Sequence, residues 1–158
     1  MPRTWLDLPE TWLAAWQRTR VAVPFTWGAR VLLWLAFLPS GLTKLLGQPF
    51  TALPRTDPVG ASSAALHDTG LYYNFIGAAQ LLAGLLLLIP RTAAVGAILS
   101  LCIVANIFVL TVGVGFSGTP VLTGLMLLAA LYLLAWEYPR WRPLLGPVQL
   151  AQTHQRGW

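Results

Sequence analysis

Four long runs of apolar residues fill most of the chain, and polar positions fall mainly in the segments between them. The runs cover residues 26–46, 71–89, 93–114 and 119–136, and each is 18 to 22 residues long. A helix needs about 20 residues to cross the hydrocarbon core of a bilayer. Backbone polar groups inside lipid must also be bonded within their own helix. The pattern therefore predicts an all-α membrane protein, an antiparallel bundle of four transmembrane helices.

The segment before the first run, residues 1–25, has a different pattern. Pro9 is suited to a first helical position, and Trp12, Leu13 and Trp16 then share one face of a helix. Such an amphipathic helix would lie in the membrane interface. We favour this N-terminal interfacial helix over the alternative, a disordered tail that contains tryptophans.

The rest of the chain divides into the bundle, residues 26–138, and a C-terminal tail, residues 139–158. One long connection, residues 48–70, interrupts the bundle and is rich in proline, glycine and serine. Long connections in small bundles often carry function or a docking surface. The other connections are tight turns.

Charge adds an orientation to this arrangement. The net charge is +5 and only 9% of residues are charged. Eight of the nine arginines precede or open the first run, lie between the second and third runs, or follow the last: Arg3, Arg18, Arg20, Arg30, Arg91, Arg140, Arg142 and Arg156. The long connection holds only Arg55, against two aspartates. Because arginine is enriched in cytoplasmic segments, we expect both termini in the cytoplasm and the long connection outside, in the cytoplasmic (inner) membrane of a bacterium. This distribution argues against nucleic acid as a partner.

Familiar catalytic and metal-binding patterns are missing from the sequence. The single cysteine, Cys102, cannot form an internal disulfide and belongs to no CxxC motif. His67 and His154 fall on opposite sides of the membrane in the expected topology, so no metal or heme site is predicted. No nucleophile–base arrangement, phosphate loop or dinucleotide fingerprint is present. We therefore assign no catalytic residue, and whether the chain is an enzyme stays open.

Polar residues within the runs are the candidates for a site, because they are costly in lipid and usually face the bundle interior. Tyr73 and Gln80 lie on one face of the second run together with two glycines. This face is either a packing seam, which we favour, or the floor of a pocket for a headgroup such as a quinone ring. Asn106 lies near the middle of the third run and needs a hydrogen-bonding partner, for which Gln80 is a candidate.

Lys44 lies near the outer end of the first run. Its ammonium either reaches the outer headgroups or turns inward toward His67, Asp68 or Tyr73, and both interpretations remain open. With antiparallel neighbours, Lys44 and Tyr73 share a membrane depth. Lys44, Tyr73, Gln80 and Asn106 therefore outline a candidate crevice for a lipid or quinone headgroup.

Three charged residues fall near the cytoplasmic boundary: Arg30, Arg91 and Glu137. We favour a structural set of ion pairs that fixes three helix ends. The alternative is an entry point for a proton or an anion.

The segment from Arg30 to Lys44 resembles the opening signature of the DoxX-like family of small four-helix membrane proteins. That signature starts with an arginine and ends in a Phe-x-x-x-Gly-x-x-Lys pattern, which Phe37, Gly41 and Lys44 match here. The glycine-rich second run and the short basic turn at residues 90–92 also resemble the family, and the likeness covers about residues 30–136. The chain departs from the family at the start of the second run, which lacks an acidic residue.

The resemblance implies a four-helix membrane bundle and a role near respiratory or redox chemistry. Family members are linked to quinone-dependent sulfur oxidation and to terminal quinol oxidase complexes. We therefore expect an accessory subunit of a larger membrane complex, with the bilayer and other membrane subunits as partners and no covalently bound cofactor. The alternatives are a quinone-reactive oxidoreductase module or anchor, and a small transporter, which the few ionisable groups in the runs disfavour.

Overall fold

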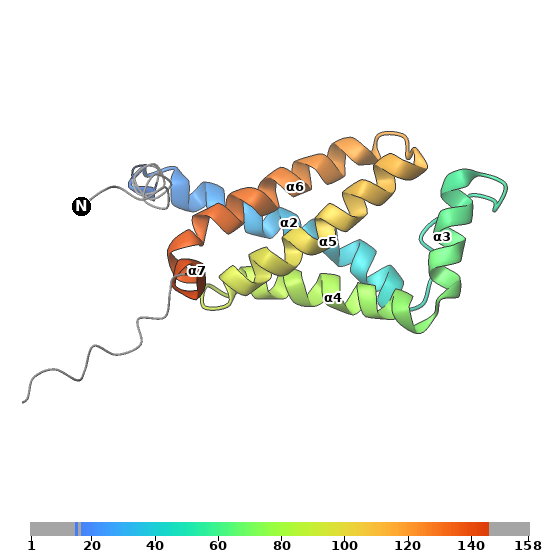
Figure 1. Ribbon diagram of the computed structural model, residues 1–158, viewed down its shortest axis with the longest axis horizontal. Coiled ribbons are helices and arrows are strands. Elements are labelled where there is room, and N and C mark those ends of the chain that lie inside the picture. Colours follow the sequence, from blue (N-terminus) through green and yellow to red (C-terminus); the bar gives the residue numbers. More distant parts are fainter. Residues whose placement is uncertain (1–14, 16, 146–158) are drawn as a thin grey trace, which may run out of the picture.

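The computed structural model describes Ala15 and residues 17–145, and the described elements are all helices (Figure 1). The helices are α2 (Ala22–Leu45), α3 (Pro58–Asp68), α4 (Leu71–Leu88), α5 (Ala93–Val114), α6 (Thr119–Trp136) and α7 (Tyr138–Leu145). Four of them, α2, α4, α5 and α6, are long and apolar enough to cross a membrane. The predicted all-helical fold with four candidate membrane-spanning helices is thus confirmed. The predicted interfacial helix at Pro9–Trp16 falls almost wholly outside the described residues.

The first long helix, α2, begins four residues before the apolar run that predicted it. Pro24 occupies its third position. The N–H groups of the first helical turn have no partner within the helix, so a proline there loses no hydrogen bond. At the other end α2 continues past Pro39 to Leu45. The other three spans begin and end within one residue of the predicted runs.

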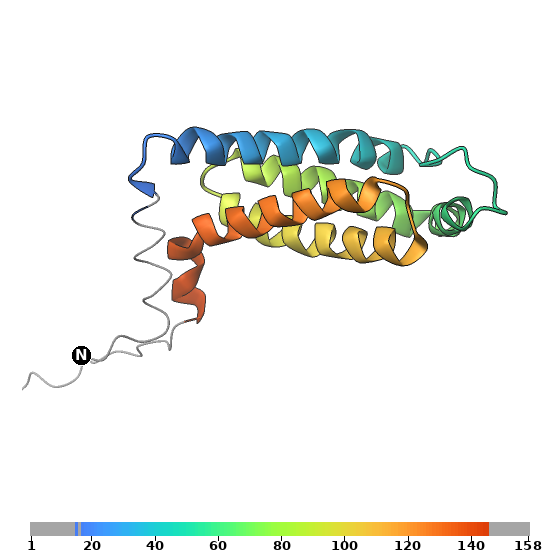
Figure 2. The same ribbon diagram turned by 90° about the horizontal axis from the view of Figure 1, so that it is seen from above.

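The four long helices lie side by side along a common direction (Figure 2). The most extensive packing joins α2 to α4, followed by α5 to α6 and α4 to α5, and a smaller contact joins α2 to α6. The α2–α4 contact is close because it is made by two glycines. A Cβ atom added to Gly77 would lie 2.7 Å from the carbonyl oxygen of Gly41. Small residues of this kind let membrane helices approach closely.

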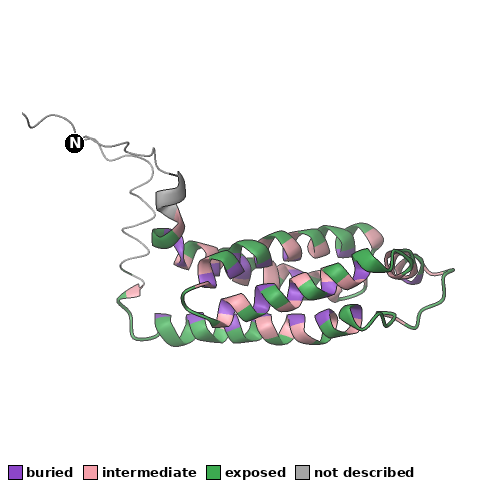
Figure 3. Ribbon diagram, turned by 90° about the horizontal axis from the view of Figure 1, so that it is seen from below, coloured by how far each residue is buried: buried purple, intermediate pink, exposed green. Residues whose placement is uncertain are grey.

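Small and aliphatic side chains form the core between the helices. One cluster contains Leu33, Leu87 and Leu133 with two alanines, and a second contains Phe37 and Val104 with Ala83. The outward faces are covered by exposed residues (Figure 3), and large aliphatic side chains are common among them. Apolar outward faces are the expected surface of a protein solvated by lipid.

The two ends of the bundle differ. At the end that we call the loop end, residues 46–70 and the turn 115–118 connect the helices, and α3 crosses the bundle there (Figure 1). Asp57 caps α3, since its carboxylate accepts hydrogen bonds from Val59 N at 2.8 Å and Gly60 N at 3.3 Å. At the opposite end, which we call the arginine end, Arg30, the turn 89–92 and α7 come together.

Candidate functional site

Lys44 is buried at the loop end of α2, with its side chain turned back along the helix. The residue is 7% exposed, and its Nζ donates hydrogen bonds to Ser40 Oγ at 2.5 Å and to Ser40 O at 3.4 Å. Ser40 precedes Lys44 by one turn, so the ammonium points about 6 Å deeper into the bundle. Helical side chains lean toward the N-terminus of their helix, which favours this direction. The side chain turns inward, as one of the two interpretations had it, but it bonds Ser40 and none of the partners that the sequence offered, which were His67, Asp68 and Tyr73.

The positive charge of Lys44 has no carboxylate beside it. None of the ion pairs among the described residues includes Lys44. Asp68, which the sequence offered as a partner, pairs instead with Arg55, with Nη1 and Oδ2 3.0 Å apart. The ammonium lies over the ring of Phe50, 4.7 Å from its centroid. A cation–π contact of this kind compensates part of the lost hydration.

Gln80 of α4 joins the same polar cluster through Ser40. It is 1% exposed, and its Oε1 accepts a hydrogen bond from Ser40 Oγ at 3.4 Å. Lys44, Ser40 and Gln80 therefore form one chain of hydrogen bonds across the close α2–α4 contact. We call these three residues together with Phe50 the Lys44 cluster.

Tyr73 closes the cluster on the loop side. It is 1% exposed, and its hydroxyl donates a hydrogen bond to Gln48 O at 2.8 Å. The ring also packs edge-on against His67, with centroids 5.3 Å apart. His67 in turn lies 3.0 Å from Gly47 O through Nε2. These contacts fix the segment that carries Phe50 over the ammonium.

Asn106 lies away from the cluster, and the predicted Gln80–Asn106 hydrogen bond is wrong. The side chain is exposed on α5 and makes no hydrogen bond to any described residue. The buried face of α5 includes Val104, and a residue two positions later is about 200° around the helix. The carboxamide therefore points outward. None of the four predicted crevice residues lines the open cavity between the segment 50–59 and the turn that connects α5 to α6.

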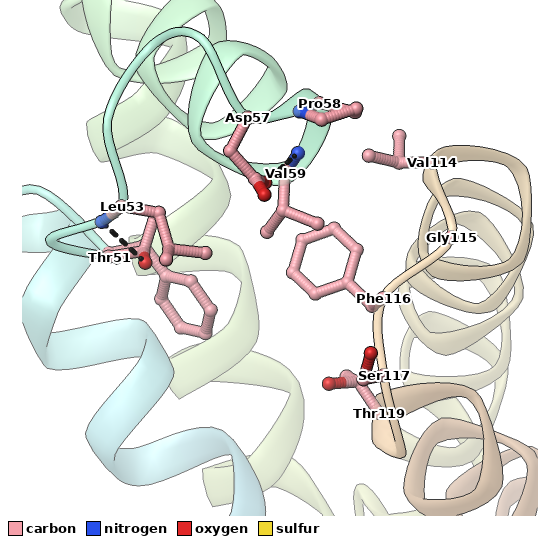
Figure 4. A pocket seen from close by; sticks show the side chains of 11 residues that line it. Thr51, Leu53, Asp57, Pro58, Val59, Val114, Gly115, Phe116, Ser117 and Thr119 are labelled. Carbon is pink, nitrogen blue, oxygen red and sulfur yellow. Dashed lines mark hydrogen bonds between the residues drawn. The ribbon is translucent and has the colours of Figure 1, made fainter.

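An open cavity lies beside the cluster at the loop end (Figure 4). Its volume is about 420 Å³, and it lies between the segment 50–59 and the turn that connects α5 to α6. Phe50, Val59 and Phe116 contribute apolar walls, and Thr51 and Ser117 contribute hydroxyls. The Phe50 ring lines this cavity and also makes the cation–π contact with the Lys44 ammonium.

Sequence reasoning missed two members of the cluster, Ser40 and Phe50. Ser40 could have been found, because it lies four residues before Lys44 and so on the same helix face. Phe50 could not, since its position depends on the chain reversing after α2, where Gly47 takes a φ of 65°.

Glu137 organises the arginine end. Its Oε1 lies 2.5 Å from Arg30 Nη2, and its Oε2 lies 2.6 Å from Arg140 Nη1. Arg140 also donates to Pro90 O in the turn between α4 and α5. Arg91, which the sequence grouped with Arg30 and Glu137, is exposed and forms no ion pair with a described residue. Arg140 takes its place because α7 folds back directly after Glu137. With both carboxylate oxygens occupied, the arrangement suits a structural role.

No His, Cys, Asp or Glu side chains gather in groups of three that could hold a metal ion within the described part of the chain. The groups around the Lys44 cluster and the cavity are an ammonium, a carboxamide, hydroxyls and the Asp57 carboxylate, with apolar walls. The ammonium, carboxamide and hydroxyls can donate hydrogen bonds to carbonyl or anionic oxygens.

Comparison with known proteins adds one relative to this geometry. The chain is 35% identical over 94 residues to an uncharacterized protein, YwoB, of Bacillus subtilis (strain 168). The matched stretch covers 56% of this chain and 60% of YwoB. No family model and no solved structure matches the chain. The name of the relative carries no activity, so function has to be argued from the site.

Proposed function

We propose that the protein is a small integral membrane subunit of a larger, redox-linked membrane complex, similar in role to DoxX-like accessory subunits. In this proposal α2, α4, α5 and α6 cross the membrane as an antiparallel bundle, with both termini in the cytoplasm. The loop end then faces outward. The subunit contributes a binding site for the oxygen-bearing headgroup of a quinone or lipid, and the Lys44 cluster is that site.

The observation that carries the proposal is the buried ammonium of Lys44. A charged group inside a membrane protein is costly, and such groups commonly mark ligand or ion sites. Here the charge is met by the neutral oxygens of Ser40 and by the Phe50 ring. Neutral acceptors compensate the lost hydration less fully than a carboxylate does. A ligand oxygen next to Nζ would supply the missing compensation.

The surroundings favour a quinone-like headgroup over a strongly hydrated ion. Ligand sites for apolar molecules combine apolar walls with a few well-placed polar groups. The cavity at the loop end has apolar walls together with hydroxyls and the Asp57 carboxylate, and Phe50 is the wall that it shares with the Lys44 cluster. Rotation of the Phe50 ring would connect the cavity to the ammonium. An isoprenoid tail could leave the site along the exposed apolar faces of the helices.

The test is purification from native membranes in a mild detergent, followed by mass spectrometry of bound small molecules and co-purifying chains. The variant Lys44→Met keeps an unbranched side chain that is one atom shorter, and it removes the charge. Arg55→Gln is the matched control, because Arg55 is 71% exposed at the same end of the bundle. A hydrogen bond to a charged group contributes about 1.5 to 3 kcal/mol, so we expect Lys44→Met to retain roughly ten- to a hundred-fold less quinone.

The wild type and Arg55→Gln should carry equal amounts of quinone and the same partner chains. If all three proteins carry the same quinone, or none does, the proposed site is wrong. If the wild type carries quinone but no partner chain, the subunit role is wrong and a stand-alone quinone-binding module replaces it.

A further inference from the structure

A continuous stripe of exposed residues runs along α5 on the side away from the bundle. Its members recur at alternating spacings of four and three: Val95, Leu99, Cys102, Asn106, Val109 and Gly113. We call this set the α5 stripe. An average spacing of 3.5 residues is the repeat with which two helices pack in a left-handed pair. The buried face of α5 already contacts α4 and α6, so the stripe is free for another helix.

The presence of Asn106 indicates that the α5 stripe faces something other than lipid alone. Asn106 is 2.5 residues from the midpoint of α5. At 1.5 Å per residue, this is about 4 Å along the helix axis. In the four spans, which the structure describes completely, Asn106 is the only exposed Asn, Gln or charged residue. Its carboxamide bonds no described residue, and hydrocarbon offers it no partner. A helix that covers the stripe must therefore bring a hydrogen-bonding group to this depth.

A second copy of the chain meets that requirement. A carboxamide is both a donor and an acceptor, so two carboxamides can bond each other across a two-fold axis. When the axis is perpendicular to the membrane, both copies keep the same orientation and identical positions meet at the same depth. A Cβ atom added to Gly113 would meet nothing within 4 Å. The small residues Cys102 and Gly113 let the backbones approach one another.

We propose that two copies of this chain associate through the α5 stripe, with the two Asn106 carboxamides hydrogen-bonded to each other. The proposal is independent of the Lys44 cluster, because the two surfaces lie on different helices. In this dimer each chain keeps its own Lys44 cluster.

The chain carries its own reporter for this contact. Cys102 is its single cysteine, is exposed, and lies one helical turn from Asn106 on the stripe. A disulfide forms only when the two Cα atoms come within about 7 Å. Membranes containing the protein at low density are treated with copper–phenanthroline, and dimers are scored on a non-reducing gel. The control is Cys102→Ser/Leu128→Cys, which moves the cysteine to an exposed position near the middle of α6.

We expect the wild type to form disulfide-linked dimers and the Leu128→Cys control to form at least about five-fold fewer. Asn106→Val should reduce dimers at Cys102 by a similar factor, and Asn106→Gln should restore them. Both substitutions are on the exposed face, so neither disturbs the core. Equal cross-linking at positions 102 and 128, or no effect of Asn106→Val, would overturn the proposal. Cross-linking of Cys102 to a different chain would assign the stripe to another subunit and overturn it as well.

Discussion

Arg30 and Glu137, 107 positions apart in the chain, form an ion pair with Nη2 and Oε1 2.5 Å apart and side chains only 6% and 4% exposed. This ion pair lies at the arginine end and joins the first span to the last. Arg140 occupies the second carboxylate oxygen and donates to Pro90 O. One carboxylate thus connects α2, α6, α7 and the turn between α4 and α5.

Removing that carboxylate should destabilise the protein strongly. Breaking one side of a buried ion pair leaves an uncompensated charge and typically costs about 3 to 5 kcal/mol. Glu137→Ala should therefore lower the free energy of unfolding by an amount near that range, measured by thermal or denaturant unfolding in detergent. Arg91→Ala is the control, because Arg91 is exposed and such substitutions usually change stability by less than about 0.5 kcal/mol. Equal effects of the two substitutions would show that Glu137 is not the organising residue.

The contact between Gly41 and Gly77 should tolerate no side chain. A Cβ atom at Gly77 would lie 2.6 Å from Leu45 N and 2.7 Å from Gly41 O. Both are backbone atoms, so the helices themselves must separate. We expect Gly77→Ala to lower the unfolding free energy by roughly 1 to 3 kcal/mol, as overpacking typically does.

The matched control for that substitution is Gly28→Ala in α2, where an added Cβ would meet nothing within 4 Å. Alanine is the better helix former, so Gly28→Ala should leave the protein as stable or slightly more stable. Both variants are followed by the same unfolding curve. A Gly77→Ala protein as stable as Gly28→Ala would contradict the close α2–α4 approach.

Orientation in the membrane is a separate prediction that rests on the arginines alone. In a Cys102→Ser background, a cysteine at Ser63 should react with a membrane-impermeant thiol reagent in intact cells. A cysteine at Thr153 should react only after the cells are made permeable. The physical reason is the retention of arginine-rich segments in the cytoplasm. The reverse labelling pattern would invert the whole topology.

The spans could be read from the sequence because hydropathy alone determines them. Three of the four helices keep the predicted bounds within one residue, and α2 differs because Pro24 belongs to its first turn rather than preceding it. The inward face of α4, with Tyr73 and Gln80 buried, also follows from helical spacing.

Partners across helices could not be read in the same way. Asn106 was expected to face Gln80, but apolar α5 is hydrophobic around most of its circumference, so periodicity does not determine which face is buried. Arg91 was expected to pair with Glu137. Arg140 pairs with it instead, because α7 folds back directly after Glu137, which hydropathy does not predict. The inward turn of Lys44 is different, because it depends on a contact within its own helix, to Ser40 four residues earlier, that helical spacing could have indicated.

The most direct test of the Lys44 cluster as a headgroup site is photoaffinity labelling with an azido-quinone, followed by peptide mass spectrometry. We predict that the label attaches between Pro39 and Phe50 or near Gln80, that unlabelled quinone displaces it, and that Lys44→Met lowers its yield roughly ten-fold or more, as loss of a hydrogen bond to a charged group requires. Labelling at the arginine end, or labelling that Lys44→Met leaves unchanged, would contradict the site.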